Sequence, residues 1–265
     1  MDKNKLVILI TGASSGIGRA TAEHLTKLGH EVIGLSRKEP RSPYGFKHRS
    51  LDISIEADVK NTIESIVKDH HRIDGLINCA GIGLSGPIEQ TNLDQARRLF
   101  EVNLFGAFAM SKYCLPHLRE SHGFIFNIGS VAGPITIPFQ TFYSMSKSAL
   151  QSFSEGLRME TRPWGVRVVT ILPGDTKTEF TDRREKIPED HLYGARLARS
   201  IAVMEQDERH GKSPMTVARA VAKLIKRKHP PVTVTVGFSY KILVWLSHRL
   251  PRRWTLAIIN HIYGK

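Results

Sequence analysis

The most constraining feature of the sequence is the stretch from Leu6 to Gly18, in which five apolar residues lead directly into a glycine-rich turn. A continuous apolar run of this length is typical of a strand buried on both faces of a parallel sheet. Helical periodicity follows from Arg19 to Leu28. The stretch therefore predicts a strand, a loop and a helix in that order, which favours folds built from repeated strand–helix units.

The loop between this strand and helix carries Gly12, Gly16 and Gly18, where side chains would block a tight turn, a ligand phosphate and close helix packing. The unpaired amides and the dipole at the start of the helix favour an anion there. The loop therefore predicts a pyrophosphate site. Its G-x-x-x-G-x-G spacing departs from the common G-x-G-x-x-G pattern, and an ordinary glycine-rich turn is the alternative.

Strand and helix patterns alternate along the rest of the chain. Further strands are predicted at residues 31–35, 46–51, 73–77, 123–128, 166–172 and 232–236, and further helices at 55–67, 93–118, 143–158 and 215–226. This alternation predicts an α/β fold, a single Rossmann-type doubly wound parallel sheet with helices on both faces. We expect one domain over residues 1–236, with a substrate lid at 175–213, and a C-terminal amphipathic extension of the same domain over 237–265.

Composition narrows the classes of partner. The chain has 265 residues, 41% of them hydrophobic, which suffices for a sizeable core. The formal charge of +13 suits a nucleic acid, an anionic membrane or an anionic ligand, but acidic residues are interspersed and no nucleic-acid-binding motif is present. We therefore expect no nucleic-acid partner.

Two further classes of site are not expected. Cys79 and Cys114 are isolated, with neither C-x-x-C spacing nor a nearby set of histidines, so we interpret both as reduced structural thiols and predict no metal site. The N-terminal apolar run is too short for a signal peptide, and no run approaches the about 20 residues of a membrane span. These features favour a cytoplasmic protein.

The end of the second predicted strand bears on the choice of dinucleotide. An acidic side chain at this place binds the ribose hydroxyl of NAD, whereas a basic one accommodates the extra phosphate of NADP. Ser36 provides no carboxylate, and Arg37 provides a planar guanidinium suited to a phosphate. We therefore expect NADP(H) rather than NAD(H), the alternative being that Arg37 is a solvated surface arginine.

Candidate catalytic side chains follow two later strands. Ligands of such sheets bind beyond the carboxyl ends of the strands, so Ser130 and the helix that begins at Tyr143 are expected beside the glycine loop. Tyr143 and Lys147 are four residues apart and lie on one side of that helix. A neighbouring ammonium favours the phenolate and lowers the pKa of a tyrosine from its usual value near 10. The pair therefore predicts proton transfer by Tyr143.

In combination these pieces resemble the short-chain dehydrogenase/reductase family. The matching segments are Thr11–Gly18 (TGASSGIG), Asn78–Gly81, Asn103, Ser130, Tyr143–Lys147 and Pro173–Gly174, which occur in the family's order over residues 5–236. One departure is Cys79, where the family more often has a second asparagine.

The resemblance implies a role for each matching residue. Tyr143 is implied to be the general acid for reduction or base for oxidation, Lys147 to lower the pKa of Tyr143 and hold the nicotinamide ribose, and Ser130 to bind the substrate oxygen. Asn103 is implied to hold a water in a proton relay. With Arg37, the expected cofactor contacts are Gly12, Ser14, Ser15, Gly16, Ile17, Gly18, Asp52, Ile53, Asn78, Ala80, Gly81, Tyr143, Lys147, Pro173, Gly174, Thr176 and Thr178.

The expected reaction is hydride transfer between a nicotinamide and a carbonyl or secondary alcohol. We expect reduction of a small apolar ketone or aldehyde by an enzyme that, like its relatives, is a homodimer or homotetramer. The alternatives are an NAD-dependent alcohol dehydrogenase, an epimerase or dehydratase, and a nucleotide-binding protein of the same family without catalysis.

Two segments bear on the substrate. Residues 175–213 mix apolar and charged residues, which suits either a mobile lid with an apolar inner side or a solvated helical hairpin. Residues 238–263 form two apolar segments around a basic break at Pro251, and resemble helices that lie in a membrane interface. A lipid-like substrate would follow from membrane contact. Packing over the pocket or against a neighbouring subunit is the alternative.

Overall fold

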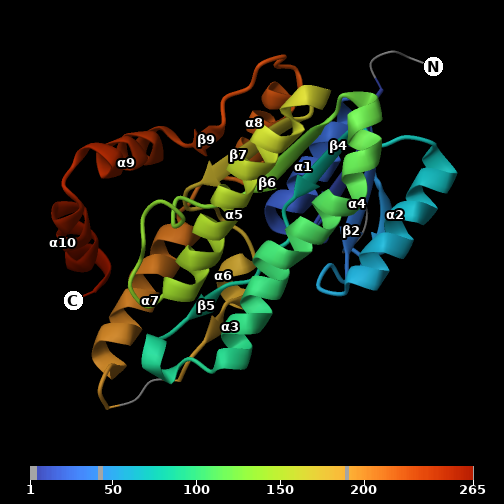
Figure 1. Cartoon of the computed structure of the whole chain (residues 1–265). Coiled ribbons are helices and arrows are strands. Elements are labelled where there is room, and N and C mark those ends of the chain that lie inside the picture. The colour runs from blue at the N-terminus through green and yellow to red at the C-terminus, as the bar shows by residue number, and fades with distance from the viewer. Residues whose placement is uncertain (1–4, 41–43, 189–190, 265) are drawn as a thin grey trace.

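Seven parallel strands form one central sheet in the order β3-β2-β1-β4-β6-β7-β9 (Figure 1). The structure is a computed structural model that describes residues 5–40, 44–188 and 191–264. Residues 1–4 and 41–43 of the predicted domain, residues 189–190 of the predicted lid and residue 265 of the predicted C-terminal extension lie outside these ranges. The sheet strands are β1 (Val7–Thr11), β2 (Glu31–Ser36), β3 (Lys47–Ser50), β4 (Gly75–Asn78), β6 (Phe124–Ile128), β7 (Arg167–Pro173) and β9 (Thr233–Val236). The predicted doubly wound parallel sheet is confirmed.

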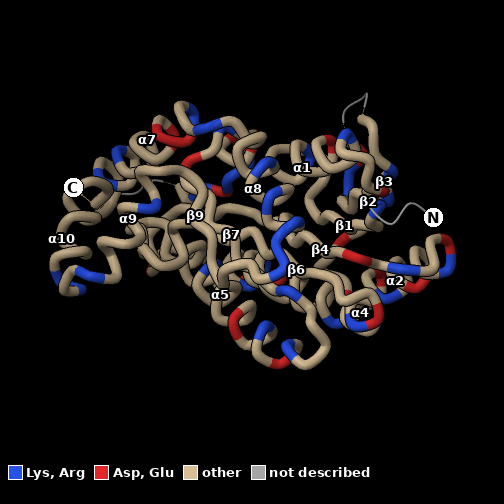
Figure 2. The backbone as a smooth tube through the Cα atoms, turned by 90° about the horizontal axis from the view of Figure 1, so that it is seen from above, with Lys and Arg blue, Asp and Glu red and all other residues tan. Residues whose placement is uncertain are grey.

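Helices cover both faces of the sheet, as the view along its edge shows (Figure 2). On one side lie α1 (Gly16–Lys27) and α8 (Met215–Ile225), and on the other α2 (Glu56–His70), α4 (Gly106–Ser121) and α5 (Thr141–Thr161). Alternate residues of β1 serve the two cores: Leu9 packs toward α2 and α4, and Ile8 toward α1 and α8. Burial on both faces explains why the strand is apolar at every position.

The helix ends differ from the predicted ranges by up to three residues, with α2 running to His70 and α5 spanning Thr141–Thr161, and two differences are instructive. Helix α1 begins at Gly16, three residues before the predicted start, because the first turn consists of loop residues without apolar periodicity. The long helix predicted at 93–118 consists of α3 (Leu93–Phe100), a π-helical turn (Glu101–Phe105) and α4. It continues past Pro116 to Ser121, where His122 adopts a left-handed conformation with φ 51°.

The segment after β7 is more ordered than the loose pattern of its sequence indicates. It contains α6 (Phe180–Arg183), β8 (Glu185–Lys186) and α7 (Gly194–Arg209), and β8 pairs with β5 (Leu84–Ser85) in a small second sheet. Leu197 and Met204 of α7 are buried. The described part of this segment therefore packs apolar side chains against the body of the protein, and its role as a lid stays a prediction.

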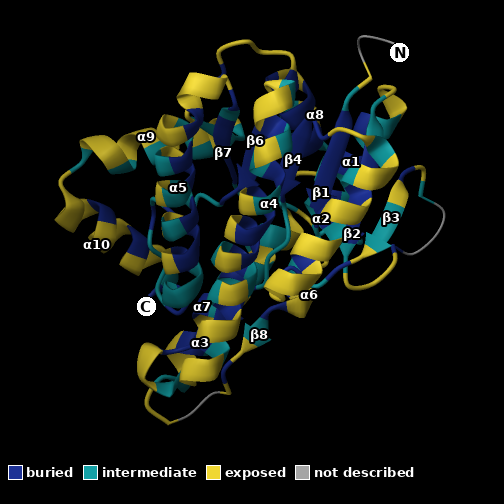
Figure 3. Cartoon of the chain, turned by 45° about the vertical axis from the view of Figure 1, so that its right-hand side comes forward, coloured by how far each residue is buried: buried dark blue, intermediate teal, exposed yellow. Residues whose placement is uncertain are grey.

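The chain ends in α9 (Phe238–Arg249) and α10 (Arg252–Tyr263), which lie at the end of the molecule farthest from α2 (Figures 1 and 3). None of the helices within the described ranges is long and apolar enough to cross a membrane.

Candidate active site

A cavity of about 670 Å³ lies at the carboxyl ends of the central strands. Its wall includes eighteen residues that the sequence predicts for the site: Gly12, Ser14, Ser15, Gly16, Ile17, Gly18, Arg37, Asp52, Ile53, Ala80, Gly81, Ser130, Tyr143, Lys147, Pro173, Gly174, Thr176 and Thr178. They lie at or just after the carboxyl ends of six strands and on two helices, because parallel strands deliver their carboxyl ends to one edge of a sheet. Asn78 and Asn103 are the two predicted residues that lie behind the wall.

The glycine loop is held close to the end of β4. The Thr11 hydroxyl accepts hydrogen bonds from the backbone N–H groups of Cys79 (3.0 Å) and Ala80 (3.1 Å). Gly12 has φ 68°, and a Cβ there would lie 2.8 Å from the Cα of Ala80. A side chain at Gly12 would therefore push the two loops apart. The backbone of Gly12 and Ala80 forms a cradle of the size and chemistry that a dinucleotide requires.

The end of β2 forms one end of the cavity. A guanidinium nitrogen of Arg37 lies 3.9 Å from a carboxylate oxygen of Asp52, and the Arg37 side chain is 68% exposed. Burial acts to raise the pKa of Asp52, but hydrogen bonds from Ser54 and the charge of Arg37 outweigh it, so the pKa lies below its ordinary value. Asp52 is therefore ionised at neutral pH, and Arg37 is free to turn toward an anion in the cavity.

Asn78 supports the cavity rather than lining it. Its side chain is 4% exposed, and its amide donates to the side-chain oxygen of Asn127 at 2.8 Å. Weaker contacts reach Ser111 and the backbone of Ala107 in α4. These bonds tie β4 to β6 and α4 just below the glycine loop. Asn78 therefore lies just behind the cavity wall, and its contact with a cofactor stays a prediction.

Ser130, Tyr143 and Lys147 meet in the middle of the cavity. The side chains of Tyr143 and Ser130 lie close together, near enough for Ser130 to lower the pKa of Tyr143, and the Ser130 hydroxyl accepts a hydrogen bond from the N–H of Ala132 at 3.1 Å. Lys147 is 5% exposed, donates to the carbonyl of Ile128 at 3.0 Å, and lies 5.8 Å from the centre of the Tyr143 ring. A substrate carbonyl oxygen beside Ser130 and Tyr143 could therefore accept hydrogen bonds from both hydroxyl groups.

The acidities of this pair differ from the sequence-based expectation. Burial raises the pKa of Tyr143 to about 12, and the contact with Ser130 opposes it by a smaller amount. The charges of Glu208 and Asp175, which raise the pKa, and of Arg184, which lowers it, contribute less. Burial also lowers the pKa of Lys147 to about 8. In the protein alone, desolvation outweighs any lowering of the Tyr143 pKa by the Lys147 ammonium. Tyr143 is therefore protonated at neutral pH, the state that a general acid requires.

Asn103 lies in the π-helical turn between α3 and α4. Its side chain accepts from the N–H of Ile82 at 2.8 Å and donates to the Ile82 carbonyl at 3.0 Å and to the Ser146 hydroxyl at 3.1 Å. A Cβ on Gly81 would lie 3.3 Å from Asn103 and 3.6 Å from the Lys147 nitrogen. Asn103 thus joins the loop after β4 to the catalytic helix, immediately behind Lys147. Single π-helical turns are frequent at functional sites.

The segment after β7 closes the cavity over the glycine loop. Thr178 lies beside Gly16, where a Cβ would meet its side chain at 3.3 Å. Arg183 of α6 donates to the hydroxyl of Ser15 at 3.0 Å. The predicted residues Pro173 to Thr178 therefore lie against the loop at which the resemblance places the cofactor.

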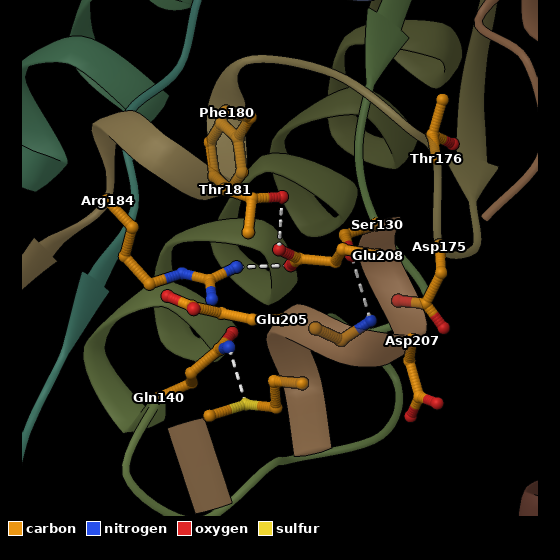
Figure 4. Close-up of polar contacts among 12 residues, drawn as sticks. Ser130, Gln140, Asp175, Thr176, Phe180, Thr181, Arg184, Glu205, Asp207 and Glu208 are labelled. Carbon is orange, nitrogen blue, oxygen red and sulfur yellow. Dashed lines mark hydrogen bonds and ion pairs between the residues drawn. The ribbon is translucent and has the colours of Figure 1, made fainter. Parts of the chain in front are cut away.

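Several residues on the substrate side are not among the predicted site residues. Gln140, Asp175, Met204, Glu208 and Tyr263 all line the cavity. Glu208 accepts a hydrogen bond from Thr181 at 2.7 Å and pairs with Arg184, whose side chain is 1% exposed (Figure 4). Gln140 donates to the sulfur of Met204. They come from segments far apart in the chain, so only folding brings them together.

The cavity has two chemically different parts that meet at Tyr143. The glycine loop, Arg37 and Asp52 offer amides and charge to a dinucleotide, and the other part carries apolar side chains, among them Val131, Phe180 and Met204. The ring of Phe180 lies 5.7 Å from that of Tyr143. A bound nicotinamide dinucleotide would supply or accept a hydride here, and the protein would supply the proton and the orientation.

Comparison with known proteins agrees with this geometry. A family model described as short chain dehydrogenase matches residues 6–188. A 3-ketodihydrosphingosine reductase of Bacteroides thetaiotaomicron is 37% identical over 241 residues, which cover 89% of this chain and 90% of that protein. The crystal structure of a short-chain dehydrogenase from Streptomyces avermitilis is similar, with a TM-score of 0.84, 27% identity and coverage of 99% of this chain and 98% of the other.

A solved structure of a 3-ketoacyl-(acyl-carrier-protein) reductase from Brucella melitensis, in complex with NADH, has a TM-score of 0.73 and 26% identity, and the match covers 87% of this chain and 96% of that one. The resemblance inferred from the motifs is thus confirmed along most of the sequence. The chain belongs to the short-chain dehydrogenase/reductase family and is an oxidoreductase that acts on carbonyl or alcohol groups with a nicotinamide cofactor.

Proposed function

We propose that this protein is an NADPH-dependent reductase of a long-chain, apolar ketone. The observation that carries the proposal is the adjacent pair of Tyr143 and Ser130 side chains, which lies where the dinucleotide part of the cavity meets an apolar part. Tyr143, which is partly buried and neutral at pH 7, is suited to protonate a carbonyl oxygen. The 37% identity with a 3-ketodihydrosphingosine reductase supports a substrate of the same kind.

In the proposed reaction, Ser130 and Tyr143 hold the carbonyl oxygen between their hydroxyls. The proton of Tyr143 passes to this oxygen while the carbonyl carbon accepts a hydride, and the tyrosinate later regains a proton from solvent. Lys147, largely protonated at pH 7 with a pKa of about 8, stabilises the tyrosinate by its charge. In the opposite direction Tyr143 accepts the proton of the alcohol.

The preference for NADPH rests on Arg37. This residue lies at the dinucleotide end of the cavity with Lys38, and Ser36 beside it has no carboxylate to bind a ribose hydroxyl. Glu39 also lines this end and accepts a hydrogen bond from Tyr44. A guanidinium that is 68% exposed can reorient from Asp52 to a phosphate at small cost.

Titration of the purified protein with NADPH and NADH tests this preference. NADPH is expected to bind at least tenfold more tightly than NADH, and Arg37→Leu to weaken NADPH alone. Arg162→Leu, at an exposed position outside the cavity, is the control. Equal affinity of the wild-type protein for both dinucleotides would favour an NAD-dependent alcohol dehydrogenase. Binding of neither would favour a protein without catalysis.

The substrate half of the cavity also supports an amino group next to the ketone, as in a long-chain 3-keto sphingoid base. Asp175 and Glu208 line this half, and both carboxylates act to raise the pKa of Tyr143. Each is already bonded, Asp175 to Tyr240 and Glu208 to Thr181 and Arg184, but a carboxylate has further acceptor sites. A substrate ammonium beside them would offset their effect on Tyr143 and make it a stronger acid.

Oxidation of NADPH with matched ketones tests the substrate. The rate with 3-ketodihydrosphingosine is expected to exceed that with a ketone of the same chain length without the amino group. Glu208→Gln is expected to lower kcat/KM for the amino ketone about tenfold, the effect of one modest ion pair, and to change the plain ketone far less. Equal losses on both ketones would show that Glu208 only supports the fold.

The setting of this activity is part of the same proposal. The isolated thiols Cys79 and Cys114 favour a reducing compartment such as the cytoplasm. We expect a homodimer or homotetramer, as the family resemblance implies. Light scattering of the purified protein tests the assembly, and fractionation of cells tests the compartment.

A further inference from the structure

Helices α9 and α10 expose an unusual amount of apolar surface. Of the twenty large apolar side chains that are exposed in the described ranges, nine lie on these two helices. Six of them define what we term the C-terminal apolar surface: Phe238, Ile242 and Trp245 on α9, and Trp254, Ile258 and Ile262 on α10. No residue of α9 is buried, and Figure 3 shows both helices mostly exposed. Such a concentration marks an interaction site.

The charge of these helices indicates the chemistry of the partner. Residues 238–264 contain Lys241, Arg249, Arg252 and Arg253 but no Asp or Glu. Figure 2 shows basic positions on α9 and α10 and no acidic ones. Exposed tryptophans together with basic residues are typical of helices that lie in the interface of an anionic membrane. Apolar surface and charge thus point to the same partner.

Contacts on the inner side fix the two helices against the catalytic cavity. Tyr240 of α9 donates to Asp175 and packs on Gly174, and both of these residues line the cavity. Tyr263 of α10 also lines the cavity and donates to Asp207 of α7 at 3.2 Å. Arg196 of α7 holds the carbonyl of Gly264 at 2.8 Å. The same helices therefore form the wall of the substrate site inside and the apolar surface outside.

We propose that α9 and α10 dock the protein on an anionic lipid bilayer, from which the long-chain substrate reaches the cavity past Tyr263. The docking surface consists of the C-terminal apolar surface and the four basic residues around it. The identity of the substrate that leaves the bilayer rests on the proposed function, but the docking itself does not depend on catalysis. Docking removes the exposed apolar side chains from water and pairs the basic residues with lipid phosphates.

A second copy of the chain is the rival occupant of this surface. In a two-fold symmetric contact the same patch meets itself. The four basic residues of one copy would then face those of the other, and residues 238–264 offer no carboxylate to pair with them. Like charges at an interface oppose association. An anionic bilayer has no such penalty, so the observations favour lipid.

Co-sedimentation of the full chain with vesicles tests the docking. The protein is expected to bind phosphatidylcholine vesicles that contain phosphatidylglycerol and to bind pure phosphatidylcholine weakly. Each basic residue near an anionic surface contributes about fivefold to partitioning, so Arg249→Gln with Arg253→Gln should weaken binding about 25-fold. Trp254→Ser with Ile258→Ser should weaken it as well. The controls are Lys223→Gln with Lys228→Gln and Met159→Ser, at exposed positions elsewhere.

Two results would overturn the proposal. One is an absence of vesicle binding that depends on this surface: either the wild-type protein does not sediment with anionic vesicles, or the variants of α9 and α10 bind as well as the controls. The other is light scattering in which Trp254→Ser with Ile258→Ser converts a dimer into a monomer while vesicle binding is unaffected, since the surface would then be a subunit interface. Circular dichroism and thermal melts establish that the variants are folded.

Activity measurements separate docking from the proposed reaction. The Trp254→Ser with Ile258→Ser variant should keep the wild-type rate on a short, water-soluble ketone and lose at least tenfold on a long-chain ketone embedded in anionic vesicles. Equal rates on the embedded ketone would contradict delivery through α9 and α10. If the wild-type protein reduces no ketone at all but still binds vesicles, the proposed function fails while the docking stands.

Discussion

Tyr143 carries the proton in the proposed reaction, so its replacement is the most direct test at the scale of a single residue. Tyr143→Phe removes one hydroxyl and leaves the ring against Phe180. We expect kcat to fall by about 10²–10⁴, the usual contribution of a general acid, with little change in NADPH affinity. Stopped-flow reduction and a binding titration measure the two effects. Tyr113→Phe is the control, because its hydroxyl bonds Glu56 in a different part of the molecule.

Lys147 is expected to stabilise the tyrosinate formed during the reaction and, because its charge is buried, to lower the free energy of unfolding. Burial lowers its pKa from 10.5 to about 8, so between these values the unfolded chain holds a proton that the folded protein has released. Stability therefore rises with pH across this window, and below about pH 8 the buried charge costs ~3 kcal/mol. The hydrogen bond from Lys147 to the Ile128 carbonyl compensates by ~1 kcal/mol.

Lys147→Met is accordingly expected to raise the free energy of unfolding at pH 7 by ~2 kcal/mol while it abolishes most of the activity. The gain should shrink as the pH rises from 8 toward 10.5. Urea denaturation at several pH values measures it. A variant that is less stable than the wild-type protein at pH 7, or a difference that does not change with pH, would contradict this account of Lys147.

The π-helical turn between α3 and α4 is the element that places Asn103. Asn103→Leu removes three hydrogen bonds and leaves the N–H and carbonyl of Ile82 without their side-chain partner. We expect a loss of ~3 kcal/mol in stability, which corresponds to a fall in Tm of ~6–12 °C for a chain of this size. The relaxed loop after β4 should also lower kcat.

Calorimetry measures the loss of stability in this variant, and Asn61→Leu, on the exposed side of α2, is its control. If Asn103→Leu melted at the wild-type temperature, the side chain would not be joining the loop to the catalytic helix. If it lost stability but kept full kcat, Asn103 would support the fold alone.

Elements with a strong pattern could be predicted from the sequence, and elements without one could not. Strand β1 is buried on both faces and α5 carries Tyr143 and Lys147 at helical spacing, so apolar content and period identify both. Strands β5 and β8 have two residues each, too few for any period. Apolar residues in the π-helical turn recur at nearly the same interval as in the flanking α-helices, so a sequence pattern does not distinguish the two. Its extra residue is visible only in the backbone.

The catalytic residues could be predicted from the sequence, whereas most residues on the substrate side of the cavity could not. Gly12, Ser130 and Tyr143 follow strands whose ends must converge, so topology alone brings them together. Glu208 lies on α7, whose path depends on long-range packing, such as the pairing of Glu208 with the buried Arg184. The acidity of Tyr143 was also beyond the sequence, since burial rather than its charged neighbour dominates the pKa.

For the whole molecule, the dinucleotide site and the C-terminal helices share a wall. Tyr240 packs on Gly174 at one end of α9, and Gly174 lies in the segment that closes over the glycine loop. A dinucleotide that binds to this wall is expected to reduce the conformational freedom of the segment that contains Gly174 and also of α9, which packs on it. Stability gained at the glycine loop should therefore extend to α9 and not stay local.

NADPH at a hundred times its Kd is expected to add about 2.7 kcal/mol to the free energy of unfolding and to raise Tm by ~5–10 °C. Hydrogen exchange should slow at Gly12–Gly18, at Gly174–Thr178 and in the first turn of α9, and remain unchanged at the C-terminal end of α2. Slowing confined to the glycine loop would mean that Tyr240 and Gly174 do not couple the two regions. The C-terminal helices would then be attached to the catalytic domain without sensing its ligand.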